Sequence, residues 1–100
     1  MDFAELKKKL RNDIELNEPD FIKETDEVLN LGYVDTSATQ KIVISISTYR
    51  TKKYFDIRTW FQAESGEWSP TKKGIRFSFD KFEEFEKAVG LIKQAVEADL

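Results

Sequence analysis

From residue 41 onward the spacing of apolar side chains changes once, and this change limits the folds that the chain can adopt. From residue 41, apolar and polar residues alternate, which places Ile42, Ile44 and Ile46 on one side of an extended segment. Alternation is typical of a half-buried strand, whereas steps of three and four residues are typical of an amphipathic helix. The second spacing begins at residue 82, with Phe82, Phe85, Val89, Ile92 and Val96. The sequence therefore predicts an α+β fold that ends in a helix.

Three more strands are predicted between these two segments. Residues 53–61 alternate like the first strand, after a turn at residues 49–52. Ser65 and Gly66 indicate the next turn, because both residue types adopt turn conformations readily. A short strand at residues 68–70, ended by proline, and another at residues 73–77 complete the pattern. We expect a four-stranded antiparallel β-sheet followed by a C-terminal α-helix.

Residues 1–39 are expected to form a helical extension and a linker before a domain at residues 40–100. Helical spacing covers residues 2–16, and Asp2 with Glu5 resembles a capping box.

A second short helix is expected from Asp20 to a stop at Gly32. Residues 35–39 are small and polar, which suits a linker. The apolar residues of this second helix are Phe21, Ile22, Val28 and Leu29.

The chain contains neither cysteine nor histidine. Disulfides, zinc sites built on these residues, thiol nucleophiles and imidazole catalysis are therefore excluded. Asp56, Glu64 and Glu67 remain as candidates for binding a hard metal, but their spacing fixes no geometry. We expect no enzyme, no metal and no cofactor.

No apolar run approaches the length of a membrane span, and the N-terminus lacks the features of a secretory signal. We therefore expect an intracellular protein without a membrane partner.

Charge is distributed unevenly, although the net charge is only −3. Residues 1–40 carry ten acidic and five basic residues, and residues 80–100 carry six acidic and three basic ones. Residues 41–79 reverse this balance, with eight basic and three acidic residues. A basic sheet surface is either simply solvated or binds nucleic acid, and interleaved aromatic residues favour the second interpretation.

Rings and cations interleave on the outward side of the predicted strands. Lys and Arg pair with phosphates, and unpaired bases offer flat faces on which rings stack. The helical regions are acidic, which argues against a helix that reads the duplex major groove. A purely structural role for these residues is the alternative, in which Trp60 lies in the core and Arg58 pairs with Asp56. The interleaved residues are Tyr49, Arg50, Lys52, Arg58, Trp60, Lys72, Lys73 and Arg76.

The stretch from Tyr49 to Ile75 resembles a known family. It contains a basic turn, the run YFDIRTWF, and the run GEWSPTKKGI with a basic pair before Gly-Ile. With the terminal helix, the chain from residue 40 onward is similar to the single-stranded-DNA-binding domain of the transcriptional coactivator positive cofactor four (p15) and its bacterial and viral relatives. The resemblance implies a homodimer in which curved four-stranded sheets present basic grooves and the C-terminal helices pack across the dimer axis.

The resemblance also implies roles for single residues, with rings stacking on bases and cations pairing with phosphates. Ser47 departs from the family, which has a basic residue there. Alternation places Phe61 on the core side and exposes Trp60, so both rings stay in the candidate site. The contacts implied are Tyr49, Arg50, Lys52, Arg58, Phe61, Lys72 and Lys73.

We expect a largely sequence-independent single-stranded-DNA-binding homodimer that holds melted strands in transcription, replication, recombination or repair. The dimer interface would be the apolar seam from Phe82 to Val96, unless that seam packs on the chain's own sheet. The sequence is also compatible with a single-stranded RNA binder, or with an interaction module whose acidic N-terminal helices bind replication or transcription proteins. Without a Ser-rich leader, a bacterial cytoplasm or a virus-infected cell is expected rather than a nucleus.

Overall fold

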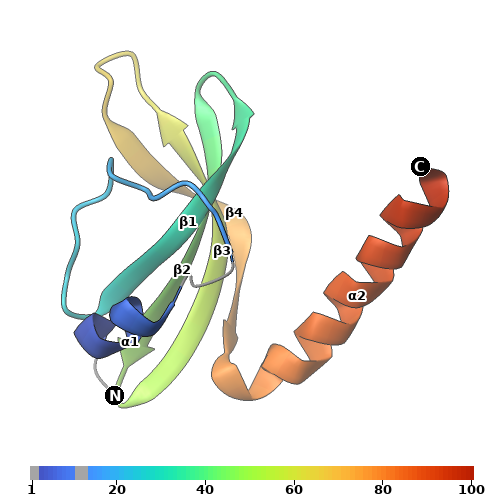
Figure 1. Ribbon diagram of the computed structural model, residues 1–100. Helices are drawn as coiled ribbons and strands as arrows, with labels where there is room; N and C mark the ends of the chain where they lie inside the picture. The colour runs from blue at the N-terminus through green and yellow to red at the C-terminus, as the bar shows by residue number, and fades with distance from the viewer. Residues whose placement is uncertain (1–2, 11–13) are drawn as a thin grey trace.

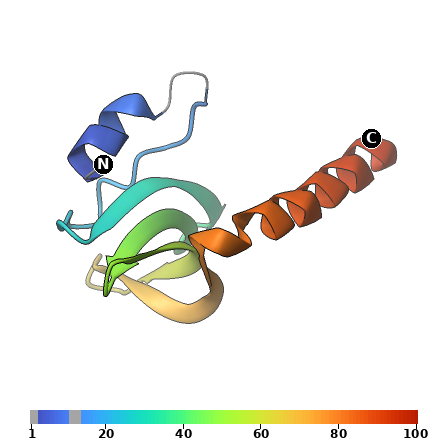
Figure 2. The ribbon, with the colours of Figure 1, turned by 90° about the horizontal axis from the view of Figure 1, so that it is seen from below.

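The computed structural model describes residues 3–10 and 14–100, in which four strands form one antiparallel sheet (Figure 1). The strands lie side by side in chain order, and the sheet they form is curved (Figure 2). This arrangement confirms the predicted class, a four-stranded antiparallel sheet followed by a C-terminal helix. The elements are α1 (Phe3–Lys9), β1 (Val28–Ser37), β2 (Gln40–Tyr49), β3 (Lys52–Gln62), β4 (Trp68–Ser78), the 3₁₀ turn η1 (Phe79–Lys81) and α2 (Phe82–Asp99).

Alternation along the strands separates two faces of the sheet. Ile46 pairs across the sheet with Leu29 and with Phe55, and these three buried side chains form the core cluster on one side, whereas buried Val43 lies on the other side. We call the side of this cluster the core face; Phe3, Leu6, Leu10, Leu31 and Phe85 pack against it. The opposite side is called the polar face, and cross-strand pairing places on it Ser45, Ser47, Tyr54, Asp56, Arg58 and Arg76.

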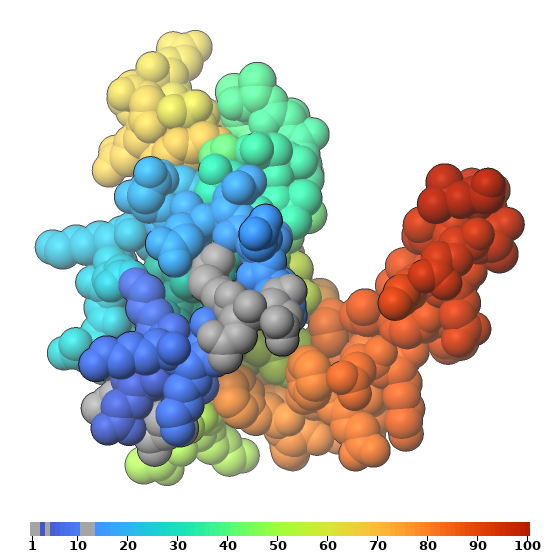
Figure 3. Space-filling model, in the orientation of Figure 1, coloured from blue at the N-terminus to red at the C-terminus, as the bar shows by residue number. Residues whose placement is uncertain are grey.

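Helix α2 touches the sheet at its first turns and then projects away from it (Figures 1 and 2). The ring centres of Phe82 and Phe85 lie 6.0 and 5.2 Å from that of Phe55. Beyond this contact the seam is uncovered: Val89 is 45%, Ile92 62% and Val96 54% exposed. In the space-filling view the end of α2 stands clear of the rest of the molecule (Figure 3). Packing on the chain's own sheet therefore accounts for only the start of the seam.

The second helix expected after Asp20 is wrong, because its second half forms β1. A register shift between Asn30 and Gly32 breaks the alternation that would have revealed a strand. Gly32 does not end a helix. A Cβ at this position would lie 2.2 Å from Cδ2 of Leu16, so the glycine lets the preceding segment cross β1 closely.

The helical extension and linker expected over residues 1–39 therefore include the first strand of the sheet. Residues 35–37 belong to β1, and residues 38 and 39 form the turn into β2. The boundary expected between residues 39 and 40 falls inside this hairpin.

The first expected helix is also shorter than the sequence predicted. Helix α1 ends at Lys9, and Ile14, an apolar residue within the expected helical range of residues 2–16, is 71% exposed. Asp2, the expected cap, and residues 11–13 lie outside the described residues.

The two short strands expected at residues 68–70 and 73–77 are one strand, β4. Pro70 does not end it, because β4 lies at the edge of the sheet and has a hydrogen-bonded neighbour on one side only. The register shifts between the pairs Arg58–Gly74 and Trp60–Pro70, so β4 bulges there. At Gly74 a Cβ would lie 2.7 Å from the Ile57 carbonyl oxygen, which explains the glycine beside the bulge.

Candidate nucleic-acid interface

Three of the expected DNA contacts gather at the turn between β2 and β3. Arg50 and Thr51 have φ of 51° and 67°, and positive φ at both central residues is characteristic of a type I′ hairpin turn. Lys52 pairs with Tyr49 across the turn. The Tyr49 ring is 57% exposed, and the guanidinium carbon of Arg50 lies 5.2 Å from its centre. The turn thus presents an exposed ring together with two cations.

Arg58 lies on the polar face and is held in place by its neighbours. Its Nε donates to Oδ1 of Asp56 at 3.1 Å, and one terminal nitrogen donates to Oδ2 at 3.2 Å. The other terminal nitrogen donates to the Thr71 carbonyl oxygen at 3.0 Å. These bonds use three of the five N–H donors of a guanidinium group. The ion pair considered from the sequence is present, and it fixes the direction of the Arg58 side chain.

Arg76 lies next to this pair, since it is the cross-strand neighbour of Asp56. Its guanidinium carbon is 4.7 Å from the centre of the Tyr54 ring, a cation–π arrangement. The sequence interpretation did not include Tyr54 in the site. Its position in the β3 alternation, on the same side as Arg58, was the signal that could have found it.

Lys72 and Lys73 are exposed at the bulge of edge strand β4. Thr71 shapes this bulge: its Oγ1 donates to the Thr59 carbonyl oxygen at 2.7 Å and accepts from the Lys73 amide at 3.2 Å. Because the same Thr71 accepts from Arg58, the bulge connects the two lysines to the polar face.

The expected site residues do not all share one surface. Tyr49, Arg58, Trp60 and Arg76 alternate onto the polar face, whereas Phe61 lies on the core face, where it is 43% exposed. Lys72 and Lys73 lie at the edge of the sheet, on β4. Ser47 also lies on the polar face, opposite Tyr54.

A second aromatic cluster at the far end of the polar face was missed by the sequence interpretation. The ring of Phe21 packs against those of Tyr33, Trp60 and Trp68, with centres 5.4, 6.2 and 5.1 Å apart. The Lys41 ammonium lies 4.4 Å from the Tyr33 ring centre and forms an ion pair with Asp35. Its hydrogen bond to Asp35 raises the pKa of Lys41 above the usual value. These contacts join distant segments, so no local pattern predicts them.

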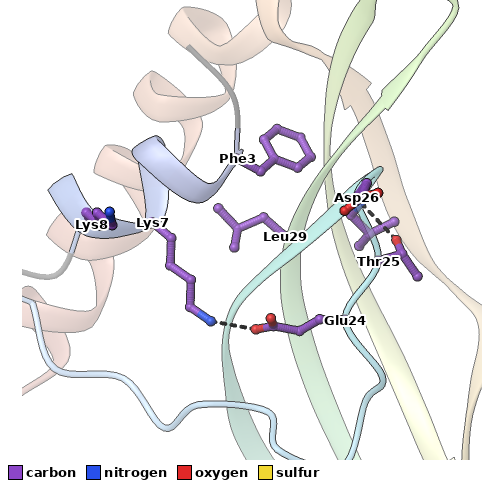
Figure 4. A pocket seen from close by; sticks show the side chains of 8 residues that line it. Phe3, Lys7, Lys8, Glu24, Thr25, Asp26 and Leu29 are labelled. Carbon is purple, nitrogen blue, oxygen red and sulfur yellow. Dashed lines mark hydrogen bonds and ion pairs between the residues drawn. The ribbon is translucent and has the colours of Figure 1, made fainter.

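A recess of ≈690 Å³ opens between α1 and the chain that enters β1 (Figure 4). Lys7 and Glu24 form an ion pair beside it, and Phe3, Asp26 and Leu29 also line it. None of the expected DNA contacts lines this recess.

Two further findings concern residues 3–10 and 14–100. Asp56, Glu64 and Glu67 do not gather into a metal site, and no group of three or more acidic side chains in these ranges could hold a metal ion. None of the helices in these ranges is long and apolar enough to cross a membrane.

The sequence model of the transcriptional coactivator p15 (PC4) family matches residues 36–88, more than half of the chain. The chain belongs to the PC4 family. The match covers β2, β3, β4 and the start of α2, and all the expected DNA contacts lie within it. PC4-family proteins bind DNA, so the family assigns a DNA-binding role to this chain.

Two solved structures of PC4 homologues resemble this one. The homologue from Burkholderia pseudomallei K96243 is 28% identical with a TM-score of 0.60, and the match covers 71% of this chain and 96% of that one. The bacteriophage T5 homologue, implicated in recombination-dependent DNA replication, is 19% identical with a TM-score of 0.54, over 72% of this chain and 81% of that one. No curated protein sequence matches the chain. The expected kinship with bacterial and viral members of the family is confirmed.

Proposed function

We propose that this PC4-family protein is a non-catalytic homodimer that binds single-stranded DNA with little dependence on sequence. The observation that carries the proposal is the group formed by Arg58, Tyr54 and Arg76 on one face of the sheet. One guanidinium group is fixed there by three hydrogen bonds, and another lies over a ring. Cations and rings so arranged suit phosphates and unpaired bases, whereas a duplex keeps its base faces stacked inside.

The strand would run from the β2–β3 turn along the polar face and cross the edge of the sheet at the β4 bulge. Tyr49 and Tyr54 would stack on bases along the first part of this path. After crossing beside Lys72 and Lys73, the strand would reach Phe61 on the core face. This path explains how residues on two faces can serve one ligand. The cations assigned to phosphates are Arg50, Lys52, Arg58, Lys72, Lys73 and Arg76.

The homodimer is proposed because the seam of α2 is uncovered in a single chain. Leu91, Ile92 and Val96 are 68%, 62% and 54% exposed. On edge strand β4, Ile75 and Phe77 are also 41% and 37% exposed, on the core face from which α2 departs. Burying such apolar surface stabilises association by about 25 cal/mol per Å². A second copy brings an identical apolar helix to this surface, as in an isologous interface.

Fluorescence anisotropy with labelled oligonucleotides of one mixed sequence tests the proposal. Titrations with single-stranded DNA, duplex DNA and RNA at two salt concentrations would be compared. We expect single-stranded DNA to bind at least about tenfold more tightly than the duplex, because only the single strand offers free base faces. Equal affinity for the duplex would contradict the proposal. Tighter binding of RNA would replace DNA by RNA as the ligand, since rings and cations alone do not read the 2′-hydroxyl.

A further inference from the structure

We propose that Asp20 and Phe21 fill a further nucleotide-binding subsite on the polar face and leave it when a DNA strand binds. The subsite contains one residue from each strand: Tyr33, Lys41, Trp60 and Trp68. This inference rests on the proposed function and extends it. It adds a second position for a base with its phosphate, and it assigns a role to the chain segment that precedes the sheet.

The rings of the subsite surround the ring of Phe21. Phe21 meets Tyr33 and Trp60 edge-on, with interplanar angles of 71° and 69°. Against Trp68 it is tilted by 39°, with the ring centres 5.1 Å apart. Two tryptophans and a tyrosine on one sheet face are the kind of platform on which unpaired bases stack. A flat base could take the place of the Phe21 ring.

Lys41 supplies the positive charge of the subsite. Its ammonium group lies 5.2 Å from the Trp68 ring centre and 5.9 Å from that of Phe21. Asp35 is its hydrogen-bond partner, and the negative charge of Asp20 also helps to raise the pKa of Lys41. Asp20 directly precedes Phe21, whose ring centre lies 5.9 Å from the Lys41 ammonium group, so the chain carries a carboxylate next to the residue whose ring enters the aromatic cluster. An anion followed by a flat ring is also the arrangement of a nucleotide.

The segment that carries Asp20 and Phe21 is attached to the sheet on both sides of them. The Tyr33 amide donates to the Asn17 carbonyl oxygen at 2.9 Å, and the Thr48 amide donates to the Glu27 carbonyl oxygen at 3.0 Å. A local turn lies between these attachments, and in it the Asp20 amide donates to the Glu18 carbonyl oxygen. This turn places Asp20 and Phe21 at the subsite. In the proposed exchange the turn leaves the subsite while both attachments remain.

The segment that carries Asp20 and Phe21 is negatively charged, as expected of a segment that competes with DNA for the subsite. Residues 14–27 contain six acidic residues and one basic residue. They lie beside a sheet that is formed mainly by the basic segment of residues 41–79. A strand that enters the subsite has to displace an acidic turn. The apparent affinity for DNA is then reduced by the fraction of molecules in which the turn is docked.

Removing the competing ring tests the inference. Phe21→Ala is expected to bind oligodeoxythymidylate on the order of tenfold more tightly than the unmodified protein, because the stacking position becomes free. Ile14→Ala, at an exposed apolar position of the same segment, is the matched control and is expected to change nothing. Unchanged or weaker binding by Phe21→Ala would overturn the inference.

The carboxylate is tested separately from the ring. Asp20→Asn and Glu15→Gln each remove one negative charge from the same segment. If Asp20 imitates a phosphate at Lys41, Asp20→Asn tightens binding several-fold more than Glu15→Gln does. Equal effects of the two variants would mean that only overall charge matters, and would overturn this part of the inference.

A fluorescence measurement leaves Asp20 and Phe21 unchanged, so it tests the inference even if Phe21→Ala does not fold. Trp60→Phe leaves Trp68 as the single tryptophan, because the chain has two. Saturating oligodeoxythymidylate is expected to quench Trp68 as a base stacks on it. Unchanged emission while anisotropy shows full binding would overturn the inference and leave the proposed function standing. No binding by the unmodified protein would overturn both.

Discussion

Trp60 and Phe61 are neighbours in β3, and their rings lie on opposite faces of the sheet. Trp60 pairs across the sheet with Lys41, whereas Phe61 pairs with Gln40. The Trp60 ring is half-buried with its centre 6.2 Å from that of Phe21, and Phe61 is 43% exposed. The two rings that the sequence could not tell apart are therefore expected to respond differently to mutation.

Phe61→Ala should weaken single-stranded DNA binding without unfolding the protein. The loss of one base stack costs about 1–3 kcal/mol, or roughly 5- to 150-fold in Kd. Anisotropy gives the Kd and circular dichroism gives the thermal midpoint. Phe79→Ala removes the same ring type at a similar exposure, 41%, outside the site and should leave the Kd unchanged. If both variants bind like the unmodified protein, Phe61 does not contact DNA.

Lys72→Ala combined with Lys73→Ala should also lower affinity while leaving stability unchanged, because both side chains are exposed on edge strand β4. The loss of two phosphate contacts should make the log–log salt slope less negative by about 1.4. A double variant with Lys87→Ala and Lys93→Ala removes the same charge from α2, where both side chains are 75% exposed. Equal losses of affinity in the two double variants would show that net charge, and not the bulge, determines binding.

The parts of the fold that the sequence predicts best are those in which one periodicity runs without interruption. The alternation of β2 and β3 and the seam of α2 indicated their elements directly, because no bulge interrupts the pairing of β2 with β3. β1 was missed because the register shift beside Asn30 removes its period of two. The sequence predicted two strands in place of β4 because Pro70 was expected to end a strand. A proline is tolerated there because β4 lies at the edge of the sheet, and the order of strands in a sheet is not visible in a local pattern.

Prediction of the candidate site from the sequence is likewise limited to residues that lie in local patterns. The residues on the turn, on β3 and at the basic pair follow from local motifs and from the family resemblance. The cluster around Phe21 could not be predicted, since it joins a segment that precedes the sheet to side chains on β1, β3 and β4.

Ile92→Asp should dissociate the proposed dimer, because a charge in an apolar seam loses its hydration without gaining a partner. Sedimentation velocity would show a dimer for the unmodified protein and a monomer for the variant, with weaker DNA binding. Gln94→Asp introduces a negative charge at the same helix, two residues from the seam, and should remain a dimer. A monomeric unmodified protein at tens of micromolar would contradict the proposed assembly.

Thr51→Gly should stabilise the protein. A β-branched residue at φ 67° is strained by about 1–2 kcal/mol, which glycine avoids at an entropic cost of about 0.5–1 kcal/mol. The expected net gain is about 0.5–1 kcal/mol, seen as a higher midpoint in chemical denaturation. Thr51→Val keeps the branched Cβ and replaces the hydroxyl that donates to the Arg50 carbonyl oxygen with a methyl group, so it should bring no gain. A gain with valine as large as with glycine would mean that backbone strain is not the cause.

The salt dependence of single-stranded DNA binding tests the central claim, a cationic sheet surface on a protein of net charge −3, most directly. Arg58 keeps two N–H donors for a phosphate, but its charge is already balanced by Asp56. The other five assigned cations therefore determine the salt dependence: Arg50, Lys52, Lys72, Lys73 and Arg76. The slope of log K against log salt is then expected to be about −3.5 per subunit. A slope near zero would contradict the assignment of these cations to the phosphates of a bound strand.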